Sequence, residues 1–376
     1  MGGVTIAPLG PVEGERRARA WLASVAEPGD ERLSTFVEER GPSAAVEAIA
    51  NGQRPFGERT AWRARAETVD IDDLMHKQFE AGGRLVIPGD AEWPTQLNDL
   101  GSTTPMILWV RGPLNLRVAA VRSVSIVGAR AASTYGVHVA STISTDLAQD
   151  DWAVVSGGAY GIDAAAHRGA LAVGGATVAV LACGVDVAYP RGHESLLERI
   201  AAEGLLVSEL PPQAHPTRSR FLVRNRVIAA LTRGTIVVEA ALRSGSLSTA
   251  RQALELSRQV MGVPGPVTSP SSAGVHQLLR SPETTLVTDA SDVADCCGLI
   301  GDDAAPWRSG RVRQRDELSG PAATVLESMP ARGSMTTQVL IRESGLDDAS
   351  VLTALGQLNL LGYVSSADGE WALVPR

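Results

Sequence analysis

Two stretches of the sequence decide the fold, Ser125-Ile126-Val127-Gly128-Ala129-Arg130-Ala131-Ala132-Ser133 and Ala153-Val154-Val155-Ser156-Gly157-Gly158-Ala159-Tyr160-Gly161-Ile162-Asp163. Each begins with an apolar, partly β-branched run, which predicts a buried strand. Each continues with glycine and small residues, which predict a tight loop. Helical periodicity follows the loops, at 137–147 and 164–172. Strand, loop and helix in repeated succession are typical of a parallel α/β sheet.

The two glycine loops also indicate a ligand. A loop that ends a strand and opens a helix presents backbone N–H groups to one point beyond the sheet, where a phosphate is favoured. The candidate phosphate-binding residues are Gly128 and Arg130 in the first loop and Ser156, Gly157 and Gly158 in the second. The alternative is that the glycines only allow tight turns between strand and helix. The tandem arrangement favours the phosphate site over this alternative.

The alternation of strands and helices continues beyond these loops. Further strands are predicted at 84–87, 106–110, 177–183, 205–208, 235–239 and 259–263, and further helices at 194–203, 224–231 and 247–256. The run at 177–183 is apolar without polar alternation, as expected for a strand that is buried on both faces. We therefore predict one parallel α/β domain over residues 81–300.

The two ends of the chain have a different pattern. Residues 1–80 contain helical runs broken at Pro28-Gly29 and Gly41-Pro42, which predict a small helical domain. Residues 301–319 lack periodicity and predict a linker. Within 320–376, helices are predicted at 322–328, 336–344 and 348–361, followed by a hairpin at 363–373. This is the order of a winged-helix domain. Because the helix at 348–361 contains no Arg or Lys, we expect this domain to contact protein or to have a structural role rather than to bind DNA.

Composition excludes several classes of protein. With 376 residues, 44% hydrophobic residues and a mean hydropathy of +0.03, a soluble protein with a sizeable core is expected. No apolar run approaches the roughly 20 residues of a membrane span, and the N-terminus has no secretion signal, so we expect a cytoplasmic protein. Cys183, Cys296 and Cys297 lack the spacing of metal ligands, so no metal site is expected. The net charge of −8 argues against nonspecific nucleic-acid binding by the whole surface.

A local basic segment nevertheless stands out at 211–234. It contains no Asp or Glu and holds Arg218, Arg220, Arg224, Arg226 and Arg233. A focused positive patch in an acidic chain favours a phosphate backbone as partner, although a solvated arginine face is the alternative. Asn225 can hydrogen-bond a base or phosphate beside Arg224 and Arg226. Phe221 and Tyr160 could offer stacking faces to unpaired bases, or could belong to the core.

Other polar residues define a possible pocket, namely Asp163, His167, Glu239, Ser244 and Gly245. Glu239 ends a predicted buried strand and precedes a small-residue loop that opens a helix. It could bind a ribose hydroxyl, act as an acid or base, or cap a neighbouring helix. Asp163 and His167 at helical spacing could orient a general base. We favour a structural N-cap role for Asp163 and a pocket-wall role for His167, because no nucleophile motif accompanies them.

Taken together, these motifs resemble the DprA family, also called Smf, of bacterial DNA-processing proteins. The motifs occur in one order: Ile126-Val127-Gly128-Ala129-Arg130, Ser156 to Asp163 with Ala166-His167, Gly184-Val185-Asp186 with Tyr189-Pro190, Arg224-Asn225-Arg226, Val238-Glu239-Ala240 with Ser244-Gly245-Ser246-Leu247-Ser248-Thr249, and Val263-Pro264-Gly265. The resemblance covers about residues 85–288.

The resemblance implies an extended Rossmann-like domain that binds single-stranded DNA without sequence preference, between an N-terminal helix-hairpin-helix-like domain and a C-terminal winged helix. It also implies a homodimer that protects incoming DNA in natural transformation and helps to load RecA, with no catalysis and no cofactor. By position, Arg130, the Ser156–Gly158 loop and Arg224-Asn225-Arg226 would contact the strand.

The sequence departs from the family pattern in several places. Leu222 and Val223 follow Phe221, where the family has proline and a further basic residue, so one phosphate contact is expected to be missing. Gly274-Val275-His276 replaces a Gly-x-Asn, and Pro28-Gly29-Asp30 replaces an N-terminal Gly-x-Gly turn.

A rival hypothesis is a hydrolase that processes nucleotides or nucleosides on a similar sheet, with Glu239 as acid or base. Phosphoribohydrolases of that kind carry Pro-Gly-Gly-x-Gly-Thr before their glutamate. Here Gly234-Thr235 stands without the Pro-Gly-Gly, which counts against this hypothesis.

Overall fold

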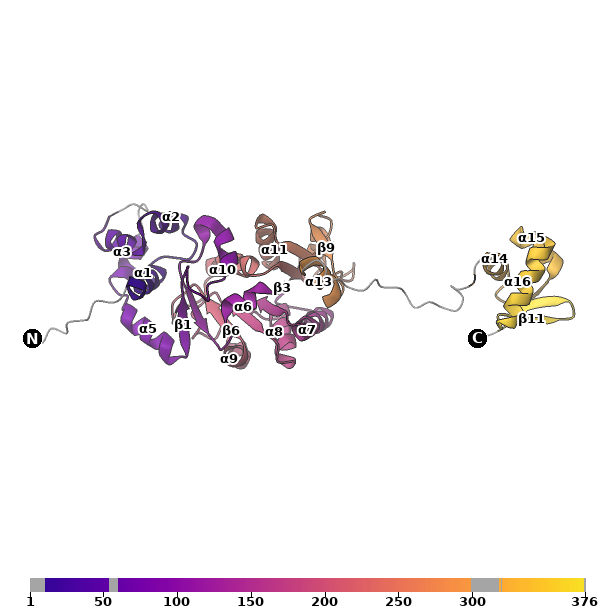
Figure 1. The fold of residues 1–376 in the computed structure, drawn as a ribbon, viewed down its shortest axis with the longest axis horizontal. Coiled ribbons are helices and arrows are strands. Elements are labelled where there is room, and N and C mark those ends of the chain that lie inside the picture. Colours follow the sequence, from indigo (N-terminus) through magenta and orange to yellow (C-terminus); the bar gives the residue numbers. More distant parts are fainter. Residues whose placement is uncertain (1–10, 54–59, 299–317, 319, 375–376) are drawn as a thin grey trace, which may run out of the picture. The chain divides into compact units, whose positions relative to one another are not determined.

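The computed structural model describes residues 11–53, 60–298, 318 and 320–374. The chain divides into two compact units, Met1–Ala305 and Pro306–Arg376, which we describe separately (Figure 1). The linker predicted at 301–319 lies outside the described residues except for Leu318. The predicted boundary at residue 80 falls inside the first unit and stays a prediction.

The first unit is built on a nine-stranded sheet with the order β1-β2-β6-β5-β4-β3-β7-β8-β9. The strands are β1 (Gly83–Val86), β2 (Leu108–Arg111), β3 (Ser123–Val127), β4 (Ala153–Ser156), β5 (Thr177–Val180), β6 (Leu205–Ser208), β7 (Gly234–Val237), β8 (Gln259–Gly262) and β9 (Thr284–Leu286). The strands from β6 to β9 are parallel, which confirms the predicted α/β sheet.

The prediction of a wholly parallel sheet was wrong at one edge. Strand β2 pairs antiparallel with both β1 and β6. A short helical segment, η1 (Thr95–Thr103), lies between β1 and β2 in the chain, and antiparallel neighbours need no crossover helix. The opposite edge strand, β9, was not predicted, because its three residues are too few and too exposed to give an apolar pattern.

Helices cover both faces of the sheet. One face carries α6 (Leu116–Val121), α10 (Arg218–Leu231), α11 (Ser246–Glu255) and α12 (Ala273–Leu278), and the other α7 (Thr134–Gln149), α8 (Ile162–Ala172), α9 (Glu194–Glu203) and α13 (Ala290–Cys297). Successive strand residues point to opposite faces. Val127 therefore packs in the cluster with α10, whereas Ile126 packs in the cluster with α7 and α8. A strand between two helical layers is buried on both faces and is therefore mostly apolar, which explains the long apolar runs.

The N-terminal helices gather at the β1 edge of the sheet (Figure 1). They are α1 (Pro11–Val25), α2 (Glu31–Arg40), α3 (Pro42–Ala50), α4 (Thr60–Ala66) and α5 (Ile71–Glu80). The predicted breaks at Pro28-Gly29 and Gly41-Pro42 are confirmed, since α2 begins after the first and ends at the second. Ala20 of α1 and Met75 of α5 share a buried cluster with Trp109 of β2, so these helices pack directly on the sheet.

The strand order creates a crevice between β3 and β7. After β3 the chain continues to β4, β5 and β6 on one side, whereas β7 leads to β8 and β9 on the other. Val127 and Val237, the last residues of β3 and β7, are paired neighbours. The loops that leave these ends diverge, and ligands of open α/β sheets bind at such a switch point.

The second unit contains α14 (Pro321–Glu327), α15 (Thr337–Ser344) and α16 (Asp348–Leu360), with β10 (Ser334–Thr336), β11 (Val364–Ala367) and β12 (Glu370–Leu373). The strands form an antiparallel sheet of order β10-β12-β11. The three predicted helices and the hairpin are confirmed. Asp368 and Gly369 form its turn with φ of 52° and 81°, the left-handed geometry that an Asp-Gly turn favours. Strand β10 was not predicted.

Candidate nucleic-acid interface

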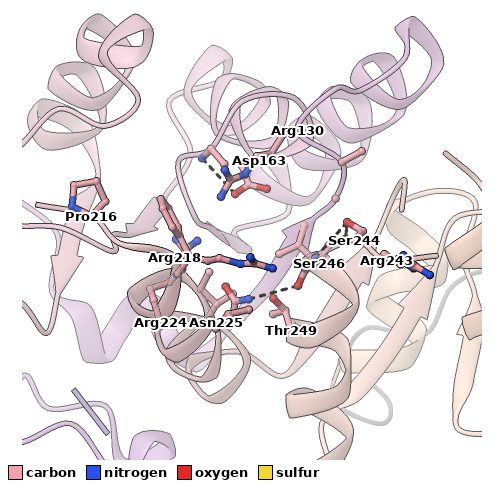
Figure 2. A pocket seen from close by; sticks show the side chains of 18 of the residues that line it. Arg130, Asp163, Pro216, Arg218, Arg224, Asn225, Arg243, Ser244, Ser246 and Thr249 are labelled. Atoms are coloured by element: carbon pink, nitrogen blue, oxygen red, sulfur yellow. Dashed lines mark hydrogen bonds between the residues drawn. The ribbon is translucent and has the colours of Figure 1, made fainter. Parts of the chain in front are cut away.

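A pocket of about 870 Å³ lies at the carboxyl ends of β3 and β7. It is lined by the loop after β3 (128–130), the start of α8 (Asp163) and the loop into α11 (243–246). The segment around the start of α10 contributes Pro216, Thr217, Arg218, Phe221, Leu222, Arg224 and Asn225. Figure 2 shows Arg130 and Asp163 on one wall, with Asn225 and Thr249 on the opposing wall. The pocket thus forms where the strand order places a binding crevice.

The lining is dominated by positive charge. Arg130, Arg218 and Arg243 are exposed there, and Arg224 is buried at its edge. Asp163 is the one carboxylate among the described lining residues. The N-termini of α10 and α11 open into the same space and add their partial positive charge. Such a pocket is suited to a polyanion.

Arg224 is held by main-chain acceptors rather than by an acid. Only 8% of the residue is exposed. Its Nη1 donates to the carbonyl oxygen of Gly157 at 2.9 Å and to that of Val180. Its buried Nε has no hydrogen-bond partner among the described residues. Burial lowers the pKa of Arg224 to about 10, so the guanidinium remains charged at neutral pH.

Aromatic rings stand beside these arginines. The guanidinium of Arg130 lies over the Phe221 ring at 4.8 Å from its centroid, and the Tyr189 ring lies 5.6 Å from Phe221. Phe221 and Tyr189 both line the pocket. Tyr160 is 47% exposed, so it is a surface residue and not a core residue. That these rings stack on bases stays a prediction.

Three amides of the two predicted phosphate-binding loops have partners within the protein. Asp163 Oδ2 accepts hydrogen bonds from the N–H groups of Gly157 at 3.1 Å and Ala159 at 3.4 Å. The Ala129 N–H donates to the Glu239 carbonyl oxygen at 2.7 Å. Ser156 is fully buried, and its Oγ donates to the Ile126 carbonyl oxygen at 2.6 Å. Gly128 lines the pocket, whereas Ser156, Gly157 and Gly158 lie behind it.

Asp163 differs from the helix cap that the sequence predicted. The N-cap of α8 is Gly161, and Asp163 lies inside the helix. Its carboxylate bonds the loop after β4 instead of the first amides of its own helix. Burial raises the pKa of Asp163, while the charge of Arg224, the two amides and the charge of Arg130 oppose this rise.

The arginines of the predicted patch do not all line the pocket. Arg226 forms a bidentate ion pair with Glu209 at 2.5 and 2.6 Å, with side-chain exposures of 8% and 10%. Arg220 pairs with Glu27 through two contacts of 2.9 Å. Neither arginine lines the pocket. The segment's own lack of acidic residues concealed these pairs, because both carboxylates come from elsewhere in the chain.

His167 and Glu239 also lie outside the pocket lining, whereas Asp163, Ser244 and Gly245 belong to it. Glu239 is buried, and its carboxylate accepts from Ser133 N–H at 2.9 Å, Ser133 Oγ at 2.5 Å and Ser271 Oγ at 3.1 Å. Ser133 is the N-cap of α7, so Glu239 fixes the start of that helix. Of the three roles that the sequence left open for Glu239, these contacts correspond to the capping of a neighbouring helix.

His167 is a buried, neutral side chain. Its Nδ1 lies 2.8 Å from Thr177 Oγ1, which donates to the Val154 carbonyl oxygen at 2.9 Å. The Thr177 hydroxyl therefore accepts from His167, which places the ring proton on Nδ1. Burial lowers the pKa of His167 to about 3, and the charges of neighbouring histidine and arginine side chains add to the effect. This histidine is not poised as a general base for the pocket.

Arg243, Thr249 and Tyr189 also line the pocket, although they were not predicted as site residues. A basic residue directly before a small-residue loop that opens a helix was the available signal for Arg243. Thr249 and Tyr189 carried none beyond their place in the family motifs. Among the described residues, no cluster of side chains suited to a metal ion occurs. Within the same residues, no helix has the length and apolar character needed to cross a membrane.

Comparisons with known proteins agree with this architecture. The sequence profile of DNA recombination-mediator protein A matches residues 84–298. A putative DNA processing protein DprA from Mycobacterium tuberculosis is 43% identical over 371 residues, covering 95% of this chain and 94% of that protein. The fold is similar to the crystal structure of DprA from Streptococcus pneumoniae, with a TM-score of 0.64, 30% identity, and coverage of 76% of this chain and 98% of the other.

A third relative is a DNA processing protein A from Helicobacter pylori, whose structure concerns a single-stranded DNA binding mode. Its TM-score is 0.50 at 28% identity, with 57% of this chain and 94% of the other covered. The profile match spans more than half of the chain, and the M. tuberculosis relative extends the similarity over nearly all of it. On this evidence the chain belongs to the DNA recombination-mediator protein A family, the family of DprA and Smf.

Proposed function

We propose that the protein binds single-stranded DNA in the pocket between the β3 and β7 loops. The observation that carries the proposal is the arginine lining, with Arg130, Arg218 and Arg243 exposed at the carboxyl ends of a parallel sheet. Proteins of this family are DNA-binding recombination mediators and not enzymes. The H. pylori relative is described as binding single-stranded DNA, which supports the same ligand here.

The preference for a single strand has a physical basis in the same pocket. Exposed arginines attract phosphates of either form of DNA. Only an unpaired strand can offer the faces of its bases to rings such as Phe221 and Tyr189, because in a duplex these faces are stacked. The nearly buried Asn225 and Thr249 provide hydrogen-bonding groups within the lining. Phosphates at the rim and bases against the rings would give sequence-independent binding.

A gel-shift titration tests this proposal. The full chain is titrated against one labelled oligonucleotide, single-stranded and then annealed, at several salt concentrations. We expect tighter binding to the single strand, and weaker binding when Arg218 and Arg243 are both changed to Ala. Arg117→Ala, at an exposed position of α6 outside the pocket, is the matched control. Equal affinities for both DNA forms, or no response to the double substitution, would overturn the proposal.

We further propose the biological setting that the family resemblance implies: a cytoplasmic homodimer that protects incoming DNA and helps to load RecA in natural transformation. The proposal includes an N-terminal helical domain up to residue 80 and a C-terminal winged helix. Since α16 has no Arg or Lys, a protein partner suits this unit better than DNA. The rate at which RecA forms filaments on single-stranded DNA, measured with and without this protein, tests the loading step. No acceleration would contradict it.

The rival, a nucleotide-processing hydrolase, has less support. Its proposed acid or base, Glu239, is engaged by Ser133 and Ser271 and lies outside the pocket lining. We expect no release of free base when the protein is incubated with nucleoside monophosphates. Turnover that is abolished by Glu239→Gln would favour the hydrolase.

A further inference from the structure

Asp163 stands at the junction of the two glycine loops and the pocket. It is 7% exposed, lines the pocket and bonds two amides of the loop after β4, those of Gly157 and Ala159. A set of converging amides after a strand is a cradle for an anion. In this protein, one carboxylate oxygen of the chain itself already occupies the position that a phosphate oxygen would take.

The charges around Asp163 are those expected to bind DNA. Arg224 and Arg130 are the cations that act on its carboxyl group. Arg218 and Arg243 line the same space, where Asp163 is the one carboxylate among the described residues. A negative charge among these arginines lowers the potential that a phosphate experiences, and a low-dielectric surrounding strengthens the effect.

Helix stabilisation alone does not explain this placement. Asp163 lies within α8 and makes neither of its two hydrogen bonds to the amides of that helix. Its partners belong to the loop that touches Arg224 through the Gly157 carbonyl oxygen. Asp163 therefore connects the loop, the buried arginine and the pocket surface.

We propose that Asp163 is an internal counter-anion that fills the amide cradle after β4 and keeps the phosphates of a bound strand at the arginine rim. It thereby limits the affinity for DNA and the number of phosphates bound. This inference rests on the proposed binding of single-stranded DNA in the same pocket. A strand held at the rim can be released to the next protein more readily than one anchored at the cradle.

The substitution Asp163→Asn tests the role of the charge. The amide oxygen of Asn can still accept from Gly157 and Ala159, while the negative charge is lost. We expect roughly tenfold tighter binding of a single-stranded oligonucleotide at low salt, with the difference shrinking as salt increases. The slope of log affinity against log salt becomes steeper by about 0.7 for each additional phosphate neutralised.

A matched control is available in the same unit. Asp186 accepts from the Gln213 N–H at 2.9 and 3.0 Å, so it also bonds a loop amide, but it lies outside the pocket lining. Asp186→Asn is expected to leave DNA affinity unchanged. Thermal unfolding of both variants shows whether each is folded at the temperature of the binding measurement.

A substitution that removes the carboxylate from the two amides provides an independent test. In Asp163→Ser the shorter side chain leaves the Gly157 and Ala159 amides open, so inorganic pyrophosphate should compete with DNA more strongly than for the unsubstituted protein. If Asp163→Asn does not fold, the DNA affinity of Asp163→Ser tests the role of the charge in its place. Unchanged or weaker DNA binding in a folded Asp163 variant overturns the counter-anion role. If the Arg218 and Arg243 double substitution still weakens binding in that case, the proposed function itself stands.

Discussion

The Nη1 of Arg224 donates a hydrogen bond to the carbonyl oxygen of Gly157 at 2.9 Å, across 67 residues of sequence. The guanidinium lies against the glycine so closely that a Cβ at position 157 would be 2.3 Å from Nη1 and 2.5 Å from Nη2. The glycine loop and the buried arginine are therefore one structural unit. Gly157 is required by the arginine, and its N–H is taken by Asp163.

Gly157→Ala should disrupt this unit. The added methyl group cannot coexist with the present position of Arg224, so the guanidinium or the loop must shift. We expect a loss of about 1–3 kcal/mol in the free energy of unfolding, as for other overpacked sites, together with weaker DNA binding. Urea denaturation and a gel shift measure the two effects. Gly356→Ala in α16, where the added Cβ meets no atom within 4 Å beyond its own helix backbone and chain neighbours, should leave DNA affinity unchanged and should raise the free energy of unfolding of its own unit by about 1 kcal/mol, because alanine is favoured over glycine inside a helix.

Arg226→Ala should act on stability and not directly on DNA. Its loss leaves the Glu209 carboxylate buried without its partner, which costs about 3–5 kcal/mol for a buried pair. The double substitution Arg226→Met with Glu209→Leu should recover most of this loss, because neither charge remains. Chemical denaturation of the single and double variants measures the loss of stability and its recovery. DNA affinity that falls in the folded double variant would instead assign Arg226 to the interface.

Arg218→Ala and Arg243→Ala should act on DNA and not on stability. Both side chains are exposed in the pocket, so each removal should change the free energy of unfolding by less than about 0.5 kcal/mol. Each should reduce the slope of log affinity against log salt by about 0.7, the effect of one lost phosphate contact on a single strand. Fluorescence anisotropy at several salt concentrations measures the slope. An unchanged slope would remove that arginine from the phosphate contacts.

Phe221→Leu should separate stacking from charge. Loss of the ring removes a stacking face worth about 1–3 kcal/mol per base, while leucine retains apolar bulk in the pocket wall. We expect weaker binding to an ordinary oligonucleotide and little change for an abasic one. An equal loss on both would show that Phe221 acts by holding Arg130, whose guanidinium lies over its ring.

The stability of the first unit should fall on acidification because of His167. Its pKa is about 3 in the folded protein, against an ordinary value of 6.5. Between these values the unfolded chain binds a proton that the folded protein does not. The contribution of neutral His167 to the free energy of unfolding is thus fully present above pH 6.5. It is lost at about 1.4 kcal/mol per pH unit below pH 6. Denaturation at pH 7, 5.5 and 4.5 tests this. His167→Gln should flatten the dependence, and an unaltered slope would contradict it.

The α/β architecture and the positions of the two glycine loops were predictable from the local sequence pattern. Short apolar, partly β-branched runs beside glycine fit strands that are buried between helices, so β3, β4, β5 and β7 were predictable from local pattern. The antiparallel strand β2 was assigned to the wrong direction. Whether a strand pairs parallel or antiparallel depends on which strand lies beside it. The residues of a buried strand are apolar in both arrangements, so the sequence pattern does not distinguish them.

Which charged residues face the pocket depends on tertiary packing and not on local sequence. Arg218, Arg224 and Arg226 lie on one helix and looked equivalent in sequence. Packing exposes Arg218, binds Arg224 to the Gly157 carbonyl oxygen, and pairs Arg226 with Glu209. Likewise, the second loop has the sequence pattern of a phosphate-binding loop, but its Gly157 and Ala159 amides donate to Asp163. A local pattern shows which groups can bind an anion, but whether the protein's own chain already supplies that anion depends on contacts between distant residues.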